Sequence, residues 1–276
     1  LHPRVRRQRQ MCIRDRIDNM REEHQEKLIK DAEKLAREQE EQEKKEAAVK
    51  AAKEHKKYGF ISVSVGEGLS TLFKELNVDY IIEGGQTMNP STEDMLTAIE
   101  KVNAKNIFIL PNNKNIIMAA NQAAELVEDK KIVVIPSKSV PQCISAMVEF
   151  NDKKSAEANE KAMNKAIGRV TSGQLTYAVR DTEIDGIEIK KDDILGMVEG
   201  KIVTVGKDID DVLNRVVSQM VDEDTEFLNV YYGKEIKKPQ ADVMLKALET
   251  KYADDEIEVS FKKGGQPLYY YIISAE

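Results

Sequence analysis

Residues 60–135 alternate short apolar runs with amphipathic helical stretches, and this alternation constrains the fold more than any other feature of the sequence. Each run is followed by a polar loop and then by a helical stretch. Runs so short and so apolar are typical of parallel strands that are buried on both faces. We predict four strands, at residues 60–65, 80–82, 107–110 and 132–135. Strands and helices in this order favour right-handed βαβ units and therefore an α/β fold with a doubly wound, mainly parallel sheet.

The clearest helix of this half is predicted over residues 92–103. Ser91 and Asp94 have the spacing of a capping box, which satisfies backbone N–H groups at a helix start. The apolar residues that would share one face are Met95, Leu96, Ile99 and Val102.

The pattern changes after residue 150. A helical stretch over residues 152–168 is followed by alternating residues and by two expected hairpin turns, at Asp185-Gly186 and Glu199-Gly200. Further on we predict helices over 208–221 and 239–249 and a strand at 227–231, with two final strands on either side of Gly264-Gly265. We interpret this glycine pair as a hairpin turn as well. The pattern indicates a second, mixed α/β subdomain.

A long charged helix is predicted in front of these subdomains. Residues 17–57 contain no Pro or Gly and are rich in Glu, Lys, Gln and Ala, which favour helices. Leu28, Ala32 and Leu35 begin an apolar seam that fades after about two turns, so we expect a solvated linker helix rather than a coiled coil.

Residues 1–16 show neither periodicity nor capping signals. We interpret them as a non-native tail, with a disordered basic tail as the alternative. The expected divisions of the chain are therefore 1–16, 17–57, 58–150 and 151–276.

Composition limits the classes of partner. The net charge is −7 although residues 1–16 hold six Arg against one Asp, so the remainder is still more acidic and nucleic acid is not an expected partner. No apolar run approaches the roughly 18 residues that a membrane span needs, so integral membrane association is not expected. The two cysteines, Cys12 and Cys143, make no disulfide framework, which indicates a cytoplasmic protein.

Three polar loops follow the predicted second, third and fourth strands and are expected to meet at one edge of the sheet. Glycines allow a ligand to approach the backbone, and the helix N-termini that follow favour an anion such as phosphate or carboxylate. Lys114 and Lys138 would supply positive charge, although tight turns without a ligand would use the same residue types. The candidate ligand-binding residues are Gly84, Gly85, Gln86, Thr87, Asn89, Ser91, Asn112, Asn113, Lys114, Ser137, Lys138 and Gln142.

No catalytic or metal site is predicted. The sequence has no GxxxxGK[ST], HExxH or GxSxG motif, and its three histidines, His2, His24 and His55, precede the predicted domains. Cys143 is expected to be a quiet, half-buried thiol. The acidic residues around 192–193 and 208–211 have the chemistry of divalent-cation ligands, but helix capping explains the second group more simply.

Several of these motifs together resemble one known family. The segments at residues 84–91, 110–115, 135–142 and 264–267 look like those of the C-terminal domain of the A subunit of fatty acid kinase, a bacterial DAK2-domain family related to dihydroxyacetone kinase. Residues 17–21 resemble the end of that family's middle domain. Cys143 stands where the family pattern has Gly.

The resemblance implies the tail of a longer kinase subunit. In such a protein an N-terminal DhaL-like domain binds ATP and Mg²⁺ and phosphorylates a fatty acid carried by a separate DegV-type B subunit. The C-terminal domain, DegV-like in fold, would help to engage that carrier, and the resemblance assigns no cofactor and no catalytic residue to this chain. Two alternatives remain: a stand-alone domain that binds a phosphate or acyl ligand, and an oligomerisation scaffold such as a homodimer.

Overall fold

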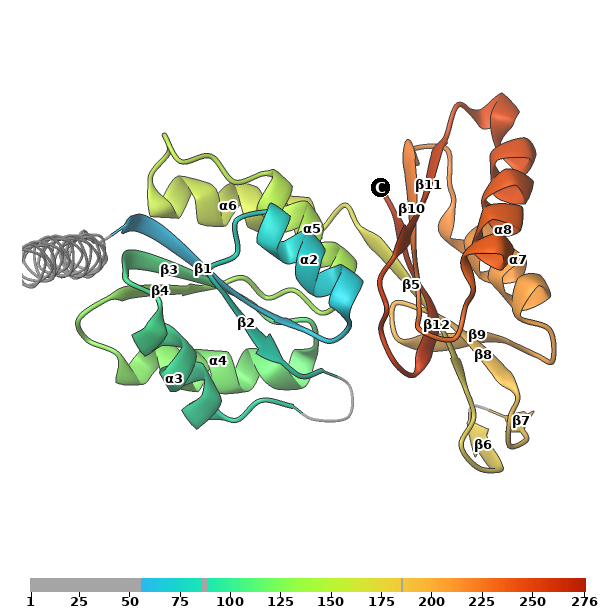
Figure 1. Ribbon diagram of the computed structural model, residues 1–276, viewed down its shortest axis with the longest axis horizontal. Helices are drawn as coiled ribbons and strands as arrows, with labels where there is room; N and C mark the ends of the chain where they lie inside the picture. The colour runs from blue at the N-terminus through green and yellow to red at the C-terminus, as the bar shows by residue number, and fades with distance from the viewer. Residues whose placement is uncertain (1–55, 86–88, 185) are drawn as a thin grey trace, which may run out of the picture. The chain divides into compact units, whose positions relative to one another are not determined.

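The structure is a computed structural model that describes residues 56–85, 89–184 and 186–276. Residues 56–276 form one compact unit containing two main sheets (Figure 1). The predicted tail at 1–16 and the linker helix up to residue 55 lie outside the described residues.

The first sheet has four parallel strands in the order β2-β1-β3-β4. This confirms the parallel sheet expected from the apolar runs. Lys56 and Lys57, predicted as the end of the linker helix, instead begin β1, because Lys56 pairs with Ala104 of β3. The strands are β1 Lys56–Ser64, β2 Tyr80–Glu83, β3 Ala104–Leu110 and β4 Lys131–Val134.

Helices cover both faces of this sheet (Figure 1), which confirms the doubly wound arrangement. Phe60 and Phe108 belong to the buried cluster on the side of α2, α5 and α6, whereas Ile61 and Ile107 belong to the cluster on the side of α3 and α4. Neighbouring residues of a strand point to opposite faces, so both faces need apolar side chains. The helices are α2 Glu67–Glu75, α3 Thr92–Lys101, α4 Lys114–Leu126, α5 Val140–Val148 and α6 Ala156–Ile167.

The start of α3 confirms the predicted capping box. The Ser91 hydroxyl accepts a hydrogen bond from the Asp94 backbone, and the Asp94 carboxylate accepts one from the Ser91 backbone at 2.8 Å. These bonds hold the pKa of Asp94 below its usual value. The cap fixes where the loop after β2 ends and the helix begins.

The second sheet has six strands in the order β11-β10-β12-β5-β8-β9, with only the β10–β11 pair parallel. Helices α7 and α8 pack on it and share one apolar cluster that includes Tyr271 and Val216. The mixed α/β subdomain is confirmed. Its elements are β5 Thr171–Tyr177, β8 Ile194–Val198, β9 Lys201–Gly206, α7 Ile209–Met220, β10 Phe227–Tyr232, α8 Lys238–Lys251, a 3₁₀ turn Ala253–Asp255, β11 Glu258–Lys263 and β12 Tyr269–Ala275.

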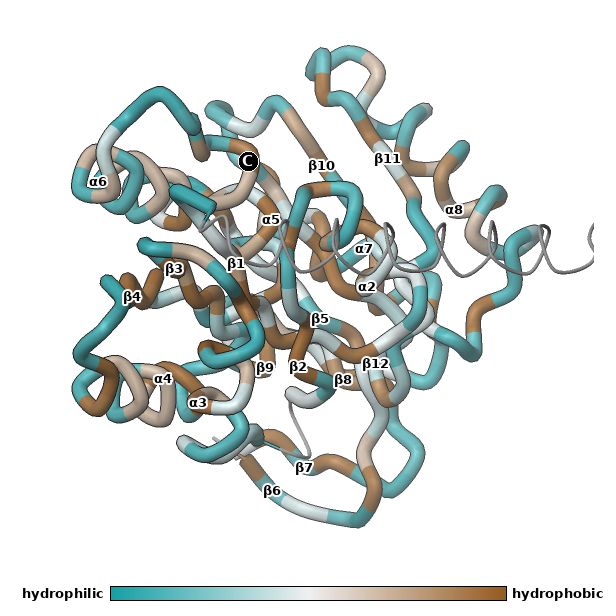
Figure 2. The backbone as a smooth tube through the Cα atoms, turned by 60° about the vertical axis from the view of Figure 1, so that its left-hand side comes forward, coloured by the Kyte–Doolittle hydropathy of each residue, from teal (hydrophilic) through white to brown (hydrophobic). Residues whose placement is uncertain are grey.

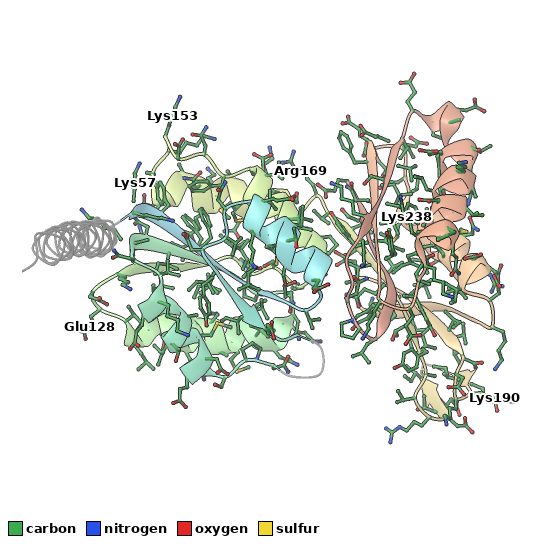
Figure 3. The ribbon with its side chains drawn as sticks, viewed as in Figure 1. Lys57, Glu128, Lys153, Arg169, Lys190 and Lys238 are labelled. Carbon is green, nitrogen blue, oxygen red and sulfur yellow. The ribbon has the colours of Figure 1, made fainter. Side chains whose placement is uncertain are left out.

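A separate two-stranded hairpin, β6 Thr182–Ile184 and β7 Ile187–Ile189, extends from the second sheet, and Figure 3 labels Lys190 just beyond it. The turn predicted at Glu199-Gly200 lies between β8 and β9, whereas Asp185 of the other predicted turn lies outside the described residues. Figure 2 shows hydrophobic residues concentrated along the strands of the main sheets and hydrophilic residues in many of the connecting loops.

The prediction of a hairpin at Gly264-Gly265 was wrong. Strand β10 lies between β11 and β12, pairing in parallel with the first and antiparallel with the second. Helix α8 carries the chain from β10 to a parallel β11, and the chain then crosses to the other side of β10. The glycine pair belongs to that crossing.

Helix α6 packs against α5, and its residues Ala156 and Met163 are buried in the same cluster as Phe60 of β1. The helix that follows residue 150 in sequence therefore covers the first sheet. The proposed boundary between residues 150 and 151 stays a prediction.

Candidate functional site

The loops that follow β2, β3 and β4 contact one another at the carboxyl edge of the first sheet. Asn113 caps α4 by accepting a hydrogen bond from the backbone of Asn115 at 2.7 Å, and its amide nitrogen donates to Asn89 Oδ1 at 2.9 Å. The Ser137 hydroxyl donates to the carbonyl oxygen of Pro111 at 2.5 Å. The positions of the helix starts are thus fixed by contacts between loops.

Two helix starts, those of α4 and α5, border a crevice with a volume of about 500 Å³. Lys114 is the first residue of α4, and Lys138 directly precedes Ser139, the N-cap of α5. The second sheet supplies the opposite wall. We call this the basic crevice; its lining residues are Asn113, Lys114, Asn115, Lys138, Ser139, Gln142, Ser172, Gln174, Met197, Glu199, Gly200, Lys201 and Tyr269.

Hydrogen bonds hold the lining of the basic crevice, and one of them joins the N-cap of α5 to the second sheet. The hydroxyls of Ser139 and Ser172 lie 2.7 Å apart, and the Ser172 backbone donates to Glu199 Oε1 at 2.7 Å. The backbone of Lys138 donates to Gln142 Oε1 at 2.7 Å. Burial raises the pKa of Tyr269 to about 12, so its phenol stays protonated at neutral pH and can donate.

A much smaller cavity, of about 30 Å³, adjoins the basic crevice, because Gln174 and Tyr269 line both. Asn112 and Gln266 also line it, and within the described part of the chain their buried side-chain oxygens have no hydrogen-bond partner. Their amide nitrogens are used: Asn112 donates to Val63 O and Gln266 to Tyr231 O, both at 2.8 Å. Each of these two oxygens can therefore accept a hydrogen bond from a ligand.

The predicted site residues thus separate into groups. Four of them, Asn113, Lys114, Lys138 and Gln142, line the basic crevice, and Gly85 and Asn112 line the small cavity. The other described candidates hold the loops: Gly84 donates to Ser64 O, Asn89 pairs with Asn113, Ser91 caps α3, and Ser137 bonds Pro111. Gln86 and Thr87 lie outside the described residues.

Sequence reasoning missed the wall that the second sheet provides. Ser172, Gln174, Lys201 and Tyr269 come from three strands of the second sheet. Only the docking of the two sheets brings them to the loops. The turn at Glu199-Gly200 and the motif at 264–267 lie close to Lys201 and Tyr269, but neither indicates that these side chains reach the loops of the first sheet.

Cys143 is fully buried rather than half-buried, with its sulfur 3.1 Å from the carbonyl oxygen of Pro111. Burial is the main reason that its pKa is raised to about 12. The thiol is therefore protonated at neutral pH and inert, as expected.

The acidic cluster at the start of α7 has a capping role. Asp208 accepts a hydrogen bond from the Asp211 backbone at 2.8 Å, as predicted for a helix N-cap. Within the described residues, no three His, Cys, Asp or Glu side chains are grouped so that they could hold a metal ion.

A second and larger groove runs beside α2, with a volume of about 760 Å³. Gly66 and Gly68 at the start of α2 form part of it, together with the end of β11. Charges of both signs surround it. We call it the α2 groove; its charged lining residues are Glu67, Lys74, Glu75, Glu83, Lys262 and Lys263.

The sequence matches the family model of the FakA-like C-terminal domain, which describes the C-terminal part of proteins like the A subunit of fatty acid kinase, over residues 59–276. Protein YloV of Bacillus subtilis is 45% identical over 264 residues, which cover 96% of this chain and 45% of the relative. An uncharacterized protein of Staphylococcus aureus strain USA300 is 43% identical over 264 residues, which again cover 96% of this chain and 45% of the relative. The chain thus spans about half the length of these relatives.

Solved structures share the fold at low sequence identity. A DegV family protein from Corynebacterium glutamicum aligns with a TM-score of 0.56 at 14% identity, covering 79% of this chain and 96% of that one. The Streptococcus pneumoniae fatty acid kinase B3 protein, loaded with linoleic acid, aligns with a TM-score of 0.52 at 11% identity, covering 79% and 99%. The dihydroxyacetone kinase of C. freundii aligns with a TM-score of 0.54 at 11% identity over 79% of this chain and 48% of that one. Among the described residues, no helix has the length and apolar character of a membrane span.

Proposed function

We propose a docking role for this chain, which belongs to the FakA-like family of fatty acid kinase subunits through its C-terminal domain. In this role it engages a DegV-type B subunit that carries the fatty acid, while ATP and Mg²⁺ bind a DhaL-like domain elsewhere in the whole protein. The whole protein would then act in the cytoplasm and phosphorylate the bound fatty acid to an acyl phosphate.

The observation that carries this proposal is the α2 groove. Its volume of about 760 Å³ suits a protruding protein segment, and its wall combines three lysines with three glutamates. Interfaces that form and separate repeatedly are more polar than permanent ones, and paired charges of both signs give them specificity. A kinase subunit that must exchange substrate-loaded and product-loaded carriers needs such an interface.

A backbone hydrogen bond joins the two elements that form the groove. The Leu69 backbone donates to the Gly264 carbonyl oxygen at 3.0 Å, which ties the start of α2 to the loop after β11. A preformed surface binds with a smaller loss of conformational entropy. This supports docking by the groove without a large rearrangement.

The experiment compares binding of a fatty-acid-loaded B subunit to the chain and to a variant carrying Lys74→Glu and Lys263→Glu. Both side chains line the groove and both positions are solvent-accessible, so the reversal changes charge with little effect on packing. We expect the dissociation constant to rise roughly tenfold and the salt dependence of association to change.

A matched control is Lys165→Glu, an exposed position on α6 that does not line the groove. It should leave the dissociation constant unchanged. Absence of binding by the unmodified chain would refute the docking role, and equal binding by the double variant would refute the groove as its place. Light scattering on the free chain measures its molar mass and so tests the alternative role as a homodimer.

A further inference from the structure

The basic crevice carries an excess of positive charge that the docking role does not use. Lys114, Lys138 and Lys201 line it from three different segments, against one carboxylate, that of Glu199. That carboxylate is engaged, because its Oε1 accepts a hydrogen bond from the Ser172 backbone at 2.7 Å. The lysines therefore face the crevice with little local compensation.

The backbone adds to this positive potential. Helices α4 and α5 both begin at the crevice, with Asn113 and Ser139 as their N-caps. The N-terminal end of a helix carries partial positive charge and favours anions. Two such ends combined with three ammonium groups favour an anion with more than one negative charge.

The small cavity next to the crevice supplies an independent indication of a ligand. Asn112 and Gln266 are 6% and 1% exposed, and each has a buried side-chain oxygen with no hydrogen-bond partner among the residues that the structure describes. Their amide orientation is fixed by the hydrogen bonds that their nitrogens donate to Val63 and Tyr231. A buried acceptor without a donor is destabilising, so a hydroxyl group in the cavity would be stabilising.

The size of the two spaces agrees with a small molecule. The crevice, at about 500 Å³, has room for a phosphate group and its hydration, whereas the adjoining cavity, at about 30 Å³, admits a hydroxyl-bearing carbon or a water molecule. Gln174 and Tyr269 line both spaces.

We propose that the basic crevice binds the phosphate group of a small hydroxylated phosphate monoester, with its hydroxyl donating one hydrogen bond to the side-chain oxygen of Asn112 or of Gln266. Lys114, Lys138 and Lys201 neutralise the phosphate, and the starts of α4 and α5 orient it. The basic crevice and the α2 groove share no lining residue, and the small cavity shares only Val65 with the groove.

Calorimetric titration of the full chain tests the site, with glycerol 2-phosphate as the hydroxylated probe and inorganic phosphate as the simpler one. All titrations are made at one ionic strength, set with sodium chloride. We expect saturable binding of both probes and a dissociation constant about fivefold lower for glycerol 2-phosphate, the effect of one added hydrogen bond.

The double substitution Lys114→Gln and Lys138→Gln should weaken binding at least about tenfold, because hydrogen bonds to charged groups are the strongest that the crevice offers. Lys105→Gln, exposed at the opposite end of β3, should leave binding unchanged. Circular dichroism and the melting temperature without ligand show that each variant is folded.

Lack of saturable binding, or binding by the double variant with unchanged affinity, would overturn the proposed site. Equal affinity for the two probes would overturn the part played by the hydroxyl. These results are independent of B-subunit docking, which is measured with variants of the α2 groove.

Discussion

Gly68 lies against the carbonyl oxygen of Lys263, so closely that a Cβ atom on Gly68 would come within 1.7 Å of that oxygen. Gly68 belongs to the first turn of α2 over the first sheet, and Lys263 ends β11 of the second. The hydrogen bond from the Leu69 backbone to Gly264 O lies at the same contact. Only glycine fits at position 68, because the backbone of α2 packs directly on the backbone at the end of β11 and leaves no room for a Cβ atom.

Replacing Gly68 by Ala should therefore separate α2 from β11. Overpacking typically costs about 1–3 kcal/mol, and the close partner here is backbone, which moves less readily than a side chain. We expect a loss of about 3 kcal/mol in the free energy of unfolding, measured by urea denaturation.

Gly168→Ala is the matched control. Gly168 ends α6 with helical torsion angles, and a Cβ atom there would lie 3.5 Å from its nearest neighbour. The free energy of unfolding of the Gly168→Ala variant should change by no more than about 0.5 kcal/mol. Similar losses for the two variants would contradict a specific contact at Gly68.

Phe108 is the centre of an aromatic cluster in the first sheet. It is fully buried, and its ring lies 5.7 Å from that of Phe60 and 5.9 Å from that of Phe150. Phe108→Ala should destabilise the fold by about 3–5 kcal/mol, through lost burial and the cavity left behind. Val148→Ala, at a position that is 69% exposed, should have almost no effect in the same denaturation experiment.

Burial of Cys143 makes stability depend on alkaline pH. The pKa of its thiol is raised from 9.0 to about 12, so the thiolate is favoured only in the unfolded state. The associated stability is fully present below pH 9 and decreases as pH rises from 9 toward 12. Cys143→Ala should reduce this decrease, as shown by urea denaturation across that range.

The same burial predicts slow chemical modification. Iodoacetamide at about pH 8 should label Cys143 in urea but not in the folded protein, with the site identified by mass spectrometry. Rapid labelling of the folded protein at this residue would show that the thiol is accessible.

The features that could be predicted from the sequence are those that depend on local residue patterns. The four short apolar runs were strands because parallel strands are buried on both faces, and Ser91 with Asp94 marked a helix start because capping is a local interaction. Lys114 and Lys138 were identified for a similar reason: polar loops follow strands at the ligand-binding edge of α/β sheets.

The remaining features depend on contacts between distant segments. Gly264-Gly265 resembles a hairpin turn locally, and only the position of β10 between β11 and β12 shows that it crosses the sheet. Ser172 and Lys201 reach the crevice only because the second sheet docks on the first. No local pattern marks Gly68 as necessary, because the constraint on this position comes from the carbonyl oxygen of Lys263, which is distant in the sequence.

The docking role is tested most directly by hydrogen–deuterium exchange of the chain with and without a fatty-acid-loaded B subunit. The α2 groove predicts that backbone amides of residues 66–75 and 260–263 become protected when the complex forms, because the partner excludes water from them. Exchange in α6 should stay unchanged. Unaltered exchange along the groove, whether the partner binds elsewhere or does not bind, would contradict the account.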